Sequence, residues 1–374
     1  MTTALSVLDL VPISSGSTAA QALRNSIDLA QRTERLGYTR YWFAEHHLNP
    51  GVAGTSTAVV LALTAAATST IRLGSGAVQL GHRTALSTVE EFGLLDALHP
   101  GRIDLGLGRS GGRPPSGDGS AVPSRVVDGR AENGLLIPPK FDVRPLLGSP
   151  RFLLQRSLLL LPGAQSQDYT EQVDDLRALI AGTYTSAEGE EVHVVPGEGA
   201  DLQIWILGSS AGESAQLAGA RGLRFAANYH VSPATVLEAV DSYRASFRPS
   251  EVLTEPYVAV SADVVVAEDE GEARELATGY GLWVRSIRTA EGAIEFPTPD
   301  EARRFAWTDA DRALVQDRVD TQLVGTPAQV ADQLELLRDA TGADALVLTT
   351  ITHDHADRVR SYDLIAAEWA RRGS

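Results

Sequence analysis

Short apolar runs alternate with segments of helical periodicity along almost the whole chain. The apolar runs span residues 4–13, 40–44, 71–80, 103–107, 203–207, 224–228, 257–266 and 345–350. The helical segments span residues 18–36, 55–68, 86–98, 169–181, 211–221, 233–247, 269–284, 326–341 and 354–371. Strands that alternate with such helices imply right-handed crossovers and a parallel sheet. Eight strands of this kind favour a closed (β/α)8 TIM barrel over an open doubly wound sheet.

Two stretches interrupt this alternation. The 374 residues accommodate one barrel of ~250 residues and about 120 residues of insertions. We therefore predict a single barrel domain, residues 1–374, with insertions at 112–165 after the fourth strand and at 285–321 after the seventh. The first insertion opens with the Gly- and Pro-rich sequence GGRPPSGDGS, and a loop of this length is usually a functional lid or carries small elements of its own.

The charge balance excludes several classes of partner. Thirty-two Lys and Arg residues against 48 Asp and Glu give a net charge of −16, which disfavours binding to nucleic acid or to an anionic membrane. No window contains the ~20 apolar residues of a spanning helix, and the N-terminus lacks the basic segment of a secretory signal. The chain has no cysteine, so thiolate nucleophiles, disulfides and cysteine metal sites are excluded. We expect a cytoplasmic protein.

The second strand ends in Glu45-His46-His47. In a (β/α)8 barrel the chemistry lies where strands end, and strand alternation would turn His46 away from its two neighbours. A hydrogen-bonded rim histidine beside a salt-bridged Glu45 would explain the motif without catalysis. A general base or charge stabiliser is the functional alternative. A zinc-protease pair is disfavoured because its histidines must lie four residues apart on a helix.

Glycines mark the ends of the third and fourth strands. Gly74-Ser75-Gly76-Ala77 places small residues in a β-branched run, which indicates a bulge, a close backbone approach to a ligand, or a packing requirement. The fourth strand ends in GLGRSG (106–111), formally a dinucleotide fingerprint. The prolines at 114 and 115 break the helix that such a site needs at its third glycine. What remains is Arg109 at a strand end, either suited to a phosphate or an ordinary surface arginine.

The fifth strand runs into Gly208-Ser209-Ser210-Ala211-Gly212-Glu213-Ser214, which opens a helix. Small and hydroxyl residues at a helix N-terminus suit a phosphate, because free backbone N–H groups and the helix dipole point at it. They also suit simple capping. Two phosphate-compatible strand ends in one barrel support each other, since a phosphorylated cofactor would use both.

The eighth strand is followed by His353-Asp354-His355 with Asp357 nearby, a pattern seen in metal-dependent hydrolases. Asp354 as the N-cap of the last helix, with solvated neighbours, explains the run without a metal. We predict no metal site here.

These strand ends together resemble the bacterial-luciferase-like, flavin-dependent monooxygenases, a superfamily of (β/α)8 barrels that also contains deazaflavin-dependent oxidoreductases. EHH and the GR…LGxGR pattern are the most specific matches. The resemblance is closest to actinomycete members that tailor aromatic polyketides in antibiotic biosynthesis, as in the mensacarcin pathway. The matching stretches are YWFAEHH (41–47), IRLGSGAVQL (71–80), EFGLLDALHPGRIDLGLGRSGG (91–112), WILGSSAGES through RGL (205–223) and VGTPAQVADQL (324–334).

The resemblance implies roles for the site residues. His46 corresponds to the active-site histidine that faces the reactive edge of the flavin, with Glu45 beside it as a second catalytic residue. Gly76 and Ala77 fall where the family has a non-proline cis peptide under the isoalloxazine ring. The implied flavin phosphate site comprises Gly108, Arg109, Ser209, Ser210, Ala211 and Ser214. Gly108 stands where luciferase itself has a cysteine, which argues against light-emitting chemistry.

The implied activity is that of a two-component monooxygenase. Reduced FMN, supplied by a separate NAD(P)H:flavin reductase, would react with O2 to give a C4a-peroxyflavin, and the oxygen would pass to an organic substrate by hydroxylation, epoxidation or Baeyer–Villiger insertion. Family members commonly form homodimers through the helices after strands two and three, which the small residues at 65–67 would suit.

Three alternatives remain open at the level of sequence. A deazaflavin (F420)-dependent oxidoreductase would use the same barrel without oxygen chemistry. A metal-dependent hydrolase would need His353 and His355 as ligands. A non-catalytic relative would bind flavin and release only hydrogen peroxide and oxidised flavin.

Overall fold

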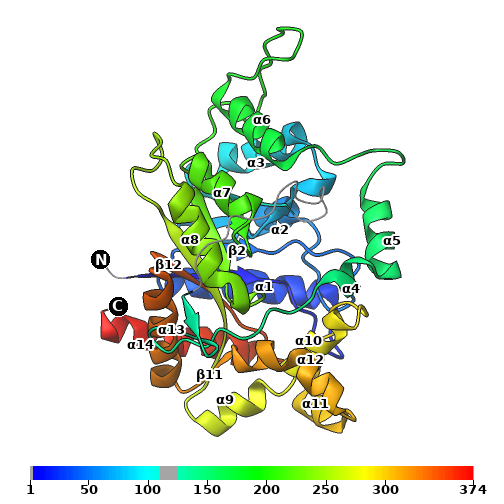
Figure 1. Ribbon diagram of the computed structural model, residues 1–374, viewed down its shortest axis with the longest axis vertical. Coiled ribbons are helices and arrows are strands. Elements are labelled where there is room, and N and C mark those ends of the chain that lie inside the picture. Colours follow the sequence, from blue (N-terminus) through cyan, green and yellow to red (C-terminus); the bar gives the residue numbers. More distant parts are fainter. Residues whose placement is uncertain (1–2, 110–124, 374) are drawn as a thin grey trace.

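The computed structural model describes residues 3–109 and 125–373, and its centre is a closed barrel of eight parallel strands surrounded by helices (Figure 1). Each strand pairs with the next in the order β1, β2, β3, β5, β8, β9, β10 and β12, and β12 returns to β1. The predicted (β/α)8 barrel is therefore confirmed. Its strands are β1 (Ala4–Asp9), β2 (Arg40–Phe43), β3 (Arg72–Ser75), β5 (Ile103–Gly108), β8 (Gln203–Gly208), β9 (Arg224–Asn228), β10 (Val258–Val266) and β12 (Ala345–Thr349).

Four short strands lie outside this ring of eight. The run predicted as one strand over 71–80 is interrupted at Gly76, and its second piece, β4 (Val78–Gln79), pairs with β5. β11 (Leu323–Gly325) lengthens the sheet beside β10. β6 (Val126–Val127) and β7 (Arg130–Ala131) form an antiparallel hairpin within the first insertion.

Several helices around the barrel begin and end at capping residues. In α13, for example, the Thr326 hydroxyl accepts from the Gln329 N–H while the Gln329 side chain accepts from the Thr326 N–H, and the helix ends at Gly342 with φ +60°. In the described part of the chain no helix is long and apolar enough to cross a membrane. The helices are α1 (Ala19–Arg35), α2 (Thr57–Ala65), α3 (Ala85–Leu98), α6 (Tyr169–Ala181), α7 (Glu213–Ala220), α8 (Val236–Ser246), α9 (Glu270–Leu276), α10 (Tyr280–Arg288), α13 (Pro327–Thr341) and α14 (His355–Arg372).

The second insertion is more regular than the sequence predicts. The helix predicted over 269–284 is two helices, α9 and α10, with residues 277–279 between them. The stretch 285–321, predicted as irregular, holds the end of α10 and two short helices, α11 (Pro299–Arg304) and α12 (Asp309–Asp320). Both open with capping boxes, which stabilise helices too short to show a clear apolar period.

The described part of the first insertion lies over one face of the barrel. It carries α4 (Arg144–Leu147) and α5 (Pro150–Leu159). Neither helix buries a residue, so both are held by few contacts. Figure 1 shows α5 at the edge of the molecule, joined to α6 by a long extended connection.

Strand alternation divides the apolar side chains into two cores. Val7 and Tyr41 point outward into an outer core that fills the space between the strands and the helices. Leu8 and Trp42 point inward into an inner core, where Trp42 packs edge-to-face on Trp205 with ring centroids 4.9 Å apart. The inner core continues from the barrel interior to α10, so it reaches the mouth of the barrel.

A buried carboxylate lies inside the barrel on β5. Asp104 is fully buried and accepts hydrogen bonds from Arg40 (2.8 Å), from Arg72 (2.8 Å) and from the indole N–H of Trp42 (2.9 Å). A buried charge is tolerated only when it is paired and hydrogen-bonded, and here two guanidinium groups provide the pairing. The charged residues at this position therefore serve the stability of the barrel.

Candidate active site

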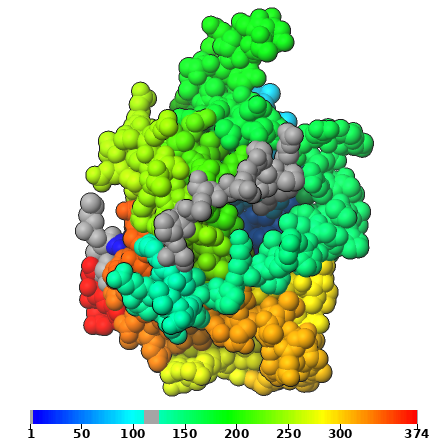
Figure 2. Space-filling model, in the orientation of Figure 1, coloured from blue at the N-terminus to red at the C-terminus, as the bar shows by residue number. Residues whose placement is uncertain are grey.

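A cavity of about 1590 Å³ opens among the carboxyl ends of the strands. It is larger than the ~300–1,000 Å³ of a pocket for one small ligand, so a cofactor and a substrate could share it. Figure 2 shows this face hollowed beside α5, with dark-blue atoms from the N-terminal part of the chain at the bottom of the hollow. All the predicted site residues line the cavity: Glu45, His46, Gly76, Ala77, Gly108, Arg109, Ser209, Ser210, Ala211 and Ser214.

His46 follows β2 and faces the cavity. Its backbone N–H donates to the Gly54 carbonyl at 2.8 Å, which fixes the loop, and its Nδ1 atom is buried with no hydrogen-bond partner among the described residues. Burial, with a smaller contribution from His47, lowers the pKa of His46 to about 4. The imidazole is therefore neutral at pH 7 and can accept or donate one proton.

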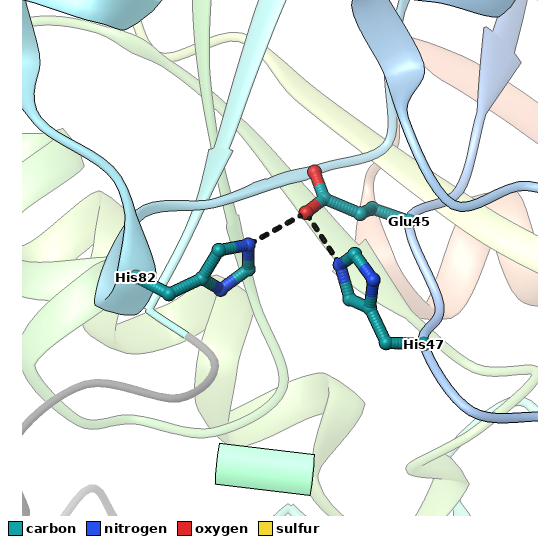
Figure 3. A group of neighbouring side chains, drawn as sticks. All are labelled: Glu45, His47 and His82. Atoms are coloured by element: carbon teal, nitrogen blue, oxygen red, sulfur yellow. Dashed lines mark hydrogen bonds and ion pairs between the residues drawn. The ribbon is translucent and has the colours of Figure 1, made fainter. Parts of the chain in front are cut away.

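Glu45 lies beside His46 and is only 3% exposed. One of its carboxylate oxygens is 2.9 Å from Nε2 of His47 and 3.1 Å from Nε2 of His82, as Figure 3 shows, and 3.6 Å from Arg83. Burial alone would raise the pKa of Glu45, but the two histidines and Arg83 lower it to about 2. The carboxylate is therefore ionised, and His47, His82 and Arg83 already interact with it.

The same three side chains have the composition of a metal site. The ligand atoms of Glu45, His47 and His82 lie within 4.8 Å of one another. The Arg83 guanidinium beside the shared oxygen opposes a second cation, and hydrogen bonds account for every short distance in the group. We therefore interpret it as a hydrogen-bonded carboxylate. His82 follows β4 in the short helix η1 (Leu80–His82), and no spacing in the sequence links it to Glu45.

Between β3 and β4, the backbone of Gly76 and Ala77 forms the floor of the cavity. The peptide bond between Gly76 and Ala77 is cis, in agreement with the resemblance. Ser75 precedes it and exchanges hydrogen bonds of 2.8 and 2.9 Å with Gly106 on β5. A side chain at Gly106 would meet the Ser75 carbonyl oxygen at 2.0 Å, so the two strands approach each other here as closely as only glycine permits.

The predicted phosphate residues lie at another wall of the cavity. Arg109 follows β5, and Ser210 and Ser214 flank the beginning of α7, whose N-cap is Gly212. Arg109 lies 3.5 Å from the carboxylate of Glu213, a pairing that the sequence interpretation did not include. The structure thus brings the ends of β5 and β8 together, and the Glu213 carboxylate lies beside Arg109.

The histidines after β12 do not meet at a common site. His353 lies 3.1 Å from the Ser15 carbonyl oxygen, whereas Nε2 of His355 lies 2.8 Å from the carboxylate of Asp28 on α1. Asp354 occupies the N-cap position of α14, as predicted, but its side chain makes no capping hydrogen bond. The hydrolase alternative, which needs both histidines on one metal, has no support in this geometry.

A polar group deeper in the cavity was not found from the sequence. Nδ1 of His230, just after β9, lies 2.6 Å from the Ser261 hydroxyl, and Asp263 is two residues further along β10. Burial first, then Arg318 and His46, lower the pKa of His230 to about 3. Burial raises the pKa of Asp263 to about 6. The available signal was the strand VAVSADVVV itself, where two polar residues with a spacing of two interrupt an apolar run.

Several known proteins match this chain over nearly its whole length. A family model described as luciferase-like monooxygenase matches residues 3–127 and 162–345. YvbT of Bacillus subtilis (strain 168) is 37% identical over 374 residues, covering 99% of this chain and 98% of YvbT. A luciferase-like monooxygenase of Escherichia coli (strain K12) is 33% identical over 363 residues, covering 97% and 96% of the two chains. The crystal structure of apo-MsnO8 superposes with a TM-score of 0.78 at 31% identity, covering 99% of this chain and 98% of MsnO8.

Proposed function

The chain belongs to the luciferase-like monooxygenase family and is an oxygenase, and from this premise we propose that it is the oxygenase component of a two-component system. In this proposal it takes reduced FMN from a separate NAD(P)H:flavin reductase and uses O2 to hydroxylate or epoxidise an organic substrate. An aromatic polyketide of secondary metabolism is the substrate class that we propose first. The proposal rests on one observation. The neutral His46 lines the same cavity as Arg109 and the beginning of α7, which are suited to bind a phosphate.

The residues present fit FMN. Arg109, the hydroxyls of Ser210 and Ser214, and the free N–H groups at the beginning of α7 form a donor set suited to a phosphate. The backbone at Gly76 and Ala77 presents no large side chain to the cavity, so a flat ring system could lie against it. The unpartnered Nδ1 of His46 is a buried polar atom of the kind that a bound ligand commonly satisfies. When bound, reduced FMN would supply the electrons that activate O2.

His46 would hold or move one proton at the reacting edge of the ring. Its neutral form is favoured by burial, so it can act as acceptor or donor without first losing a proton to solvent. Glu45 is a poor proton acceptor, because three neighbouring groups already hold its ionised carboxylate. We therefore propose that Glu45 positions the loop that carries His46.

Apolar side chains would exclude water from the reacting atoms. Trp283 and Ile287 of α10 line the cavity from one side, and Phe152 and Leu153 of α5 line it from another. A dry cavity would strengthen a hydrogen bond from His46 to a bound ligand and would keep water from the reacting atoms. We propose that α4 and α5 contribute to the substrate chamber.

We further propose a homodimer through α2 and α3. Val59 and Leu63 lie one turn apart on α2, and Leu94 and Leu98 lie one turn apart on α3, each pair on one helix face. All four side chains are more than half exposed, and Leu98 is 78% exposed. A large exposed apolar surface of this kind is typical of an interaction site. Of the small residues at 65–67 that the sequence suggests for this interface, Ala65 is buried, whereas Ala66 is exposed.

Anaerobic titration tests the cofactor. Photoreduced FMN should bind saturably, and mixing the complex with oxygenated buffer should give an absorbance transient that outlives the reoxidation of free flavin. His46→Ala should shorten that transient while reduced FMN still binds. Failure of reduced FMN to bind, with saturable binding of reduced F420, would instead establish the deazaflavin enzyme.

A further inference from the structure

A buried arginine in the cavity lining belongs to none of the motifs found in the sequence. Arg318 is in the last turn of α12, lines the cavity and is only 7% exposed. Among the described residues no carboxylate oxygen lies within the 4.0 Å of an ion pair with its guanidinium. A buried charge without a counter-ion is costly and is usually retained for a ligand or a reaction.

The hydrogen bonds of Arg318 leave part of the guanidinium unused. Nε and Nη2 donate to the Tyr280 hydroxyl at 3.2 and 2.8 Å. No residue in the described part of the chain accepts a hydrogen bond from Nη1. Because Tyr280 is neutral and itself buried, it does not compensate the charge.

The other charged and titratable groups that face Arg318 are already engaged or neutral. Asp263 on β10 is the carboxylate that faces Arg318, but it accepts a hydrogen bond from Gln322 at 2.9 Å and forms no ion pair with the guanidinium within 4.0 Å. His230 and His46 are neutral at pH 7. The cavity floor therefore carries a positive charge that the protein compensates only in part.

Two further donors in the same lining have no partner among the described residues. They are the indole N–H of Trp283 on α10 and the hydroxyl of Thr349, which lies opposite Asp263 in the pairing of β12 with β10. Unsatisfied buried polar atoms are rare in native proteins and each calls for an explanation. Both residues line the same cavity as Arg318.

We propose that Arg318 binds the carboxylate of the substrate, so that the substrate is an organic acid with an apolar body. This rests on the proposed function in placing a substrate beside the cofactor. The planar guanidinium matches a carboxylate, and its free N–H groups can form charge-assisted hydrogen bonds in a water-poor cavity. The apolar body would lie against Trp283, Ile287 and Ile351, which line the cavity.

Calorimetric binding of a matched pair of probes tests the proposal. At pH 7.5 the ligand-free protein should bind 3-phenylpropanoate at least about tenfold more tightly than 3-phenylpropanamide. Arg318→Gln should remove this preference and Arg318→Lys should retain part of it. The control Arg156→Gln, which removes an exposed cation from the cavity lining, should leave the preference unchanged.

Equal binding of the two probes, or no detectable binding of either, would overturn the proposal. So would a full preference in Arg318→Gln, or its loss in Arg156→Gln. If Arg318→Gln does not fold by circular dichroism, the wild-type comparison and Arg318→Lys still decide. Reduced FMN should bind Arg318→Gln and wild type alike. Failure of wild type to bind it would reject the flavin proposal while leaving the carboxylate preference to be judged on its own result.

Discussion

Nη1 of Arg109 lies 3.5 Å from a carboxylate oxygen of Glu213. The residue best suited to a phosphate is therefore paired with an acidic side chain in the first turn of α7, at the position where an anion would also be stabilised by the helix dipole. A phosphate that enters this site must share Arg109 with that carboxylate, and Glu213 should limit the affinity for the cofactor.

Glu213→Gln should tighten the binding of reduced FMN. Removal of a partly exposed charge beside an anion is worth about 0.5–1 kcal/mol, which corresponds to about two- to fivefold in affinity. Anaerobic titrations with reduced FMN and with reduced riboflavin measure the effect, and riboflavin, which lacks the phosphate, should bind unchanged. An equal gain for both flavins would place the phosphate elsewhere.

His46→Gln should reduce the acid sensitivity of folding. The pKa of His46 is about 4 in the folded protein, below its value of about 6.5 in the unfolded chain, so the unfolded state binds more protons between these values. Stability is complete above pH 6.5 and falls by about 3 kcal/mol as the pH drops towards 4. Urea unfolding from pH 7 to pH 4 should show a shallower fall in the variant.

Asp263→Asn should have the opposite pH signature. Since the folded pKa of Asp263 is raised to about 6, the folded state binds the proton more tightly, and stability is lost as the pH rises from about 4 to 6. The variant should equal wild type near pH 4 and exceed it by about 2–3 kcal/mol at pH 8. A variant that is less stable than wild type at pH 8 would contradict the raised pKa.

Glu45→Gln should destabilise the protein at pH 7. The substitution removes the buried carboxylate that His47 and His82 contact, while Arg83 keeps its ion pair with Glu91 at 2.9 Å, and the loss of hydrogen bonds to a charged group costs about 1.5–3 kcal/mol. Urea unfolding measures the loss. Arg144→Gln provides the comparison, because this arginine belongs to a solvent-exposed ion pair and its removal should change stability little. A loss for Glu45→Gln no larger than that for Arg144→Gln would refute the role of Glu45 as the centre of the cluster.

Leu98→Glu should prevent formation of the proposed dimer. A charge in the middle of an apolar interface would be desolvated without a partner. Sedimentation velocity should show a dimer for wild type and a monomer for the variant. Leu161→Glu, at an equally exposed leucine outside α2 and α3, should remain dimeric. A monomeric wild-type protein would reject the dimer itself.

The barrel could be predicted from the sequence because its strands are continuous apolar runs. β10 and β12 are buried on both faces, so β12 reads as apolar up to Thr349 and β10 reads as apolar apart from Ser261 and Asp263. The second insertion could not be predicted in the same way. α11 and α12 depend on capping boxes and on contacts with α10, which apolar periodicity does not register.

The same difference applies to the candidate site: its residues at strand ends could be predicted, and its residues on other elements could not. His46, Gly76 and Arg109 lie at strand ends. Because the carboxyl ends of all strands in a (β/α)8 barrel meet at one face, their proximity could be predicted. His82 and Arg318 come from a short turn and from an insertion helix, and their position follows only from the folded chain. The position of Asp354 at the N-cap of α14 could be predicted, but its side chain makes no capping hydrogen bond.

Mutations in the inner core and mutations in the outer core should have different consequences. Leu8, Trp42 and Trp283 belong to the inner core and also line the cavity, whereas most outer-core side chains lie between strands and helices, away from any ligand. Exchange of inner-core residues at the barrel mouth can therefore change which molecule is accepted while the shell that holds the strands together is preserved. A lineage built on this chain could acquire a new substrate by a few replacements at one end of the barrel, without evolving a new architecture.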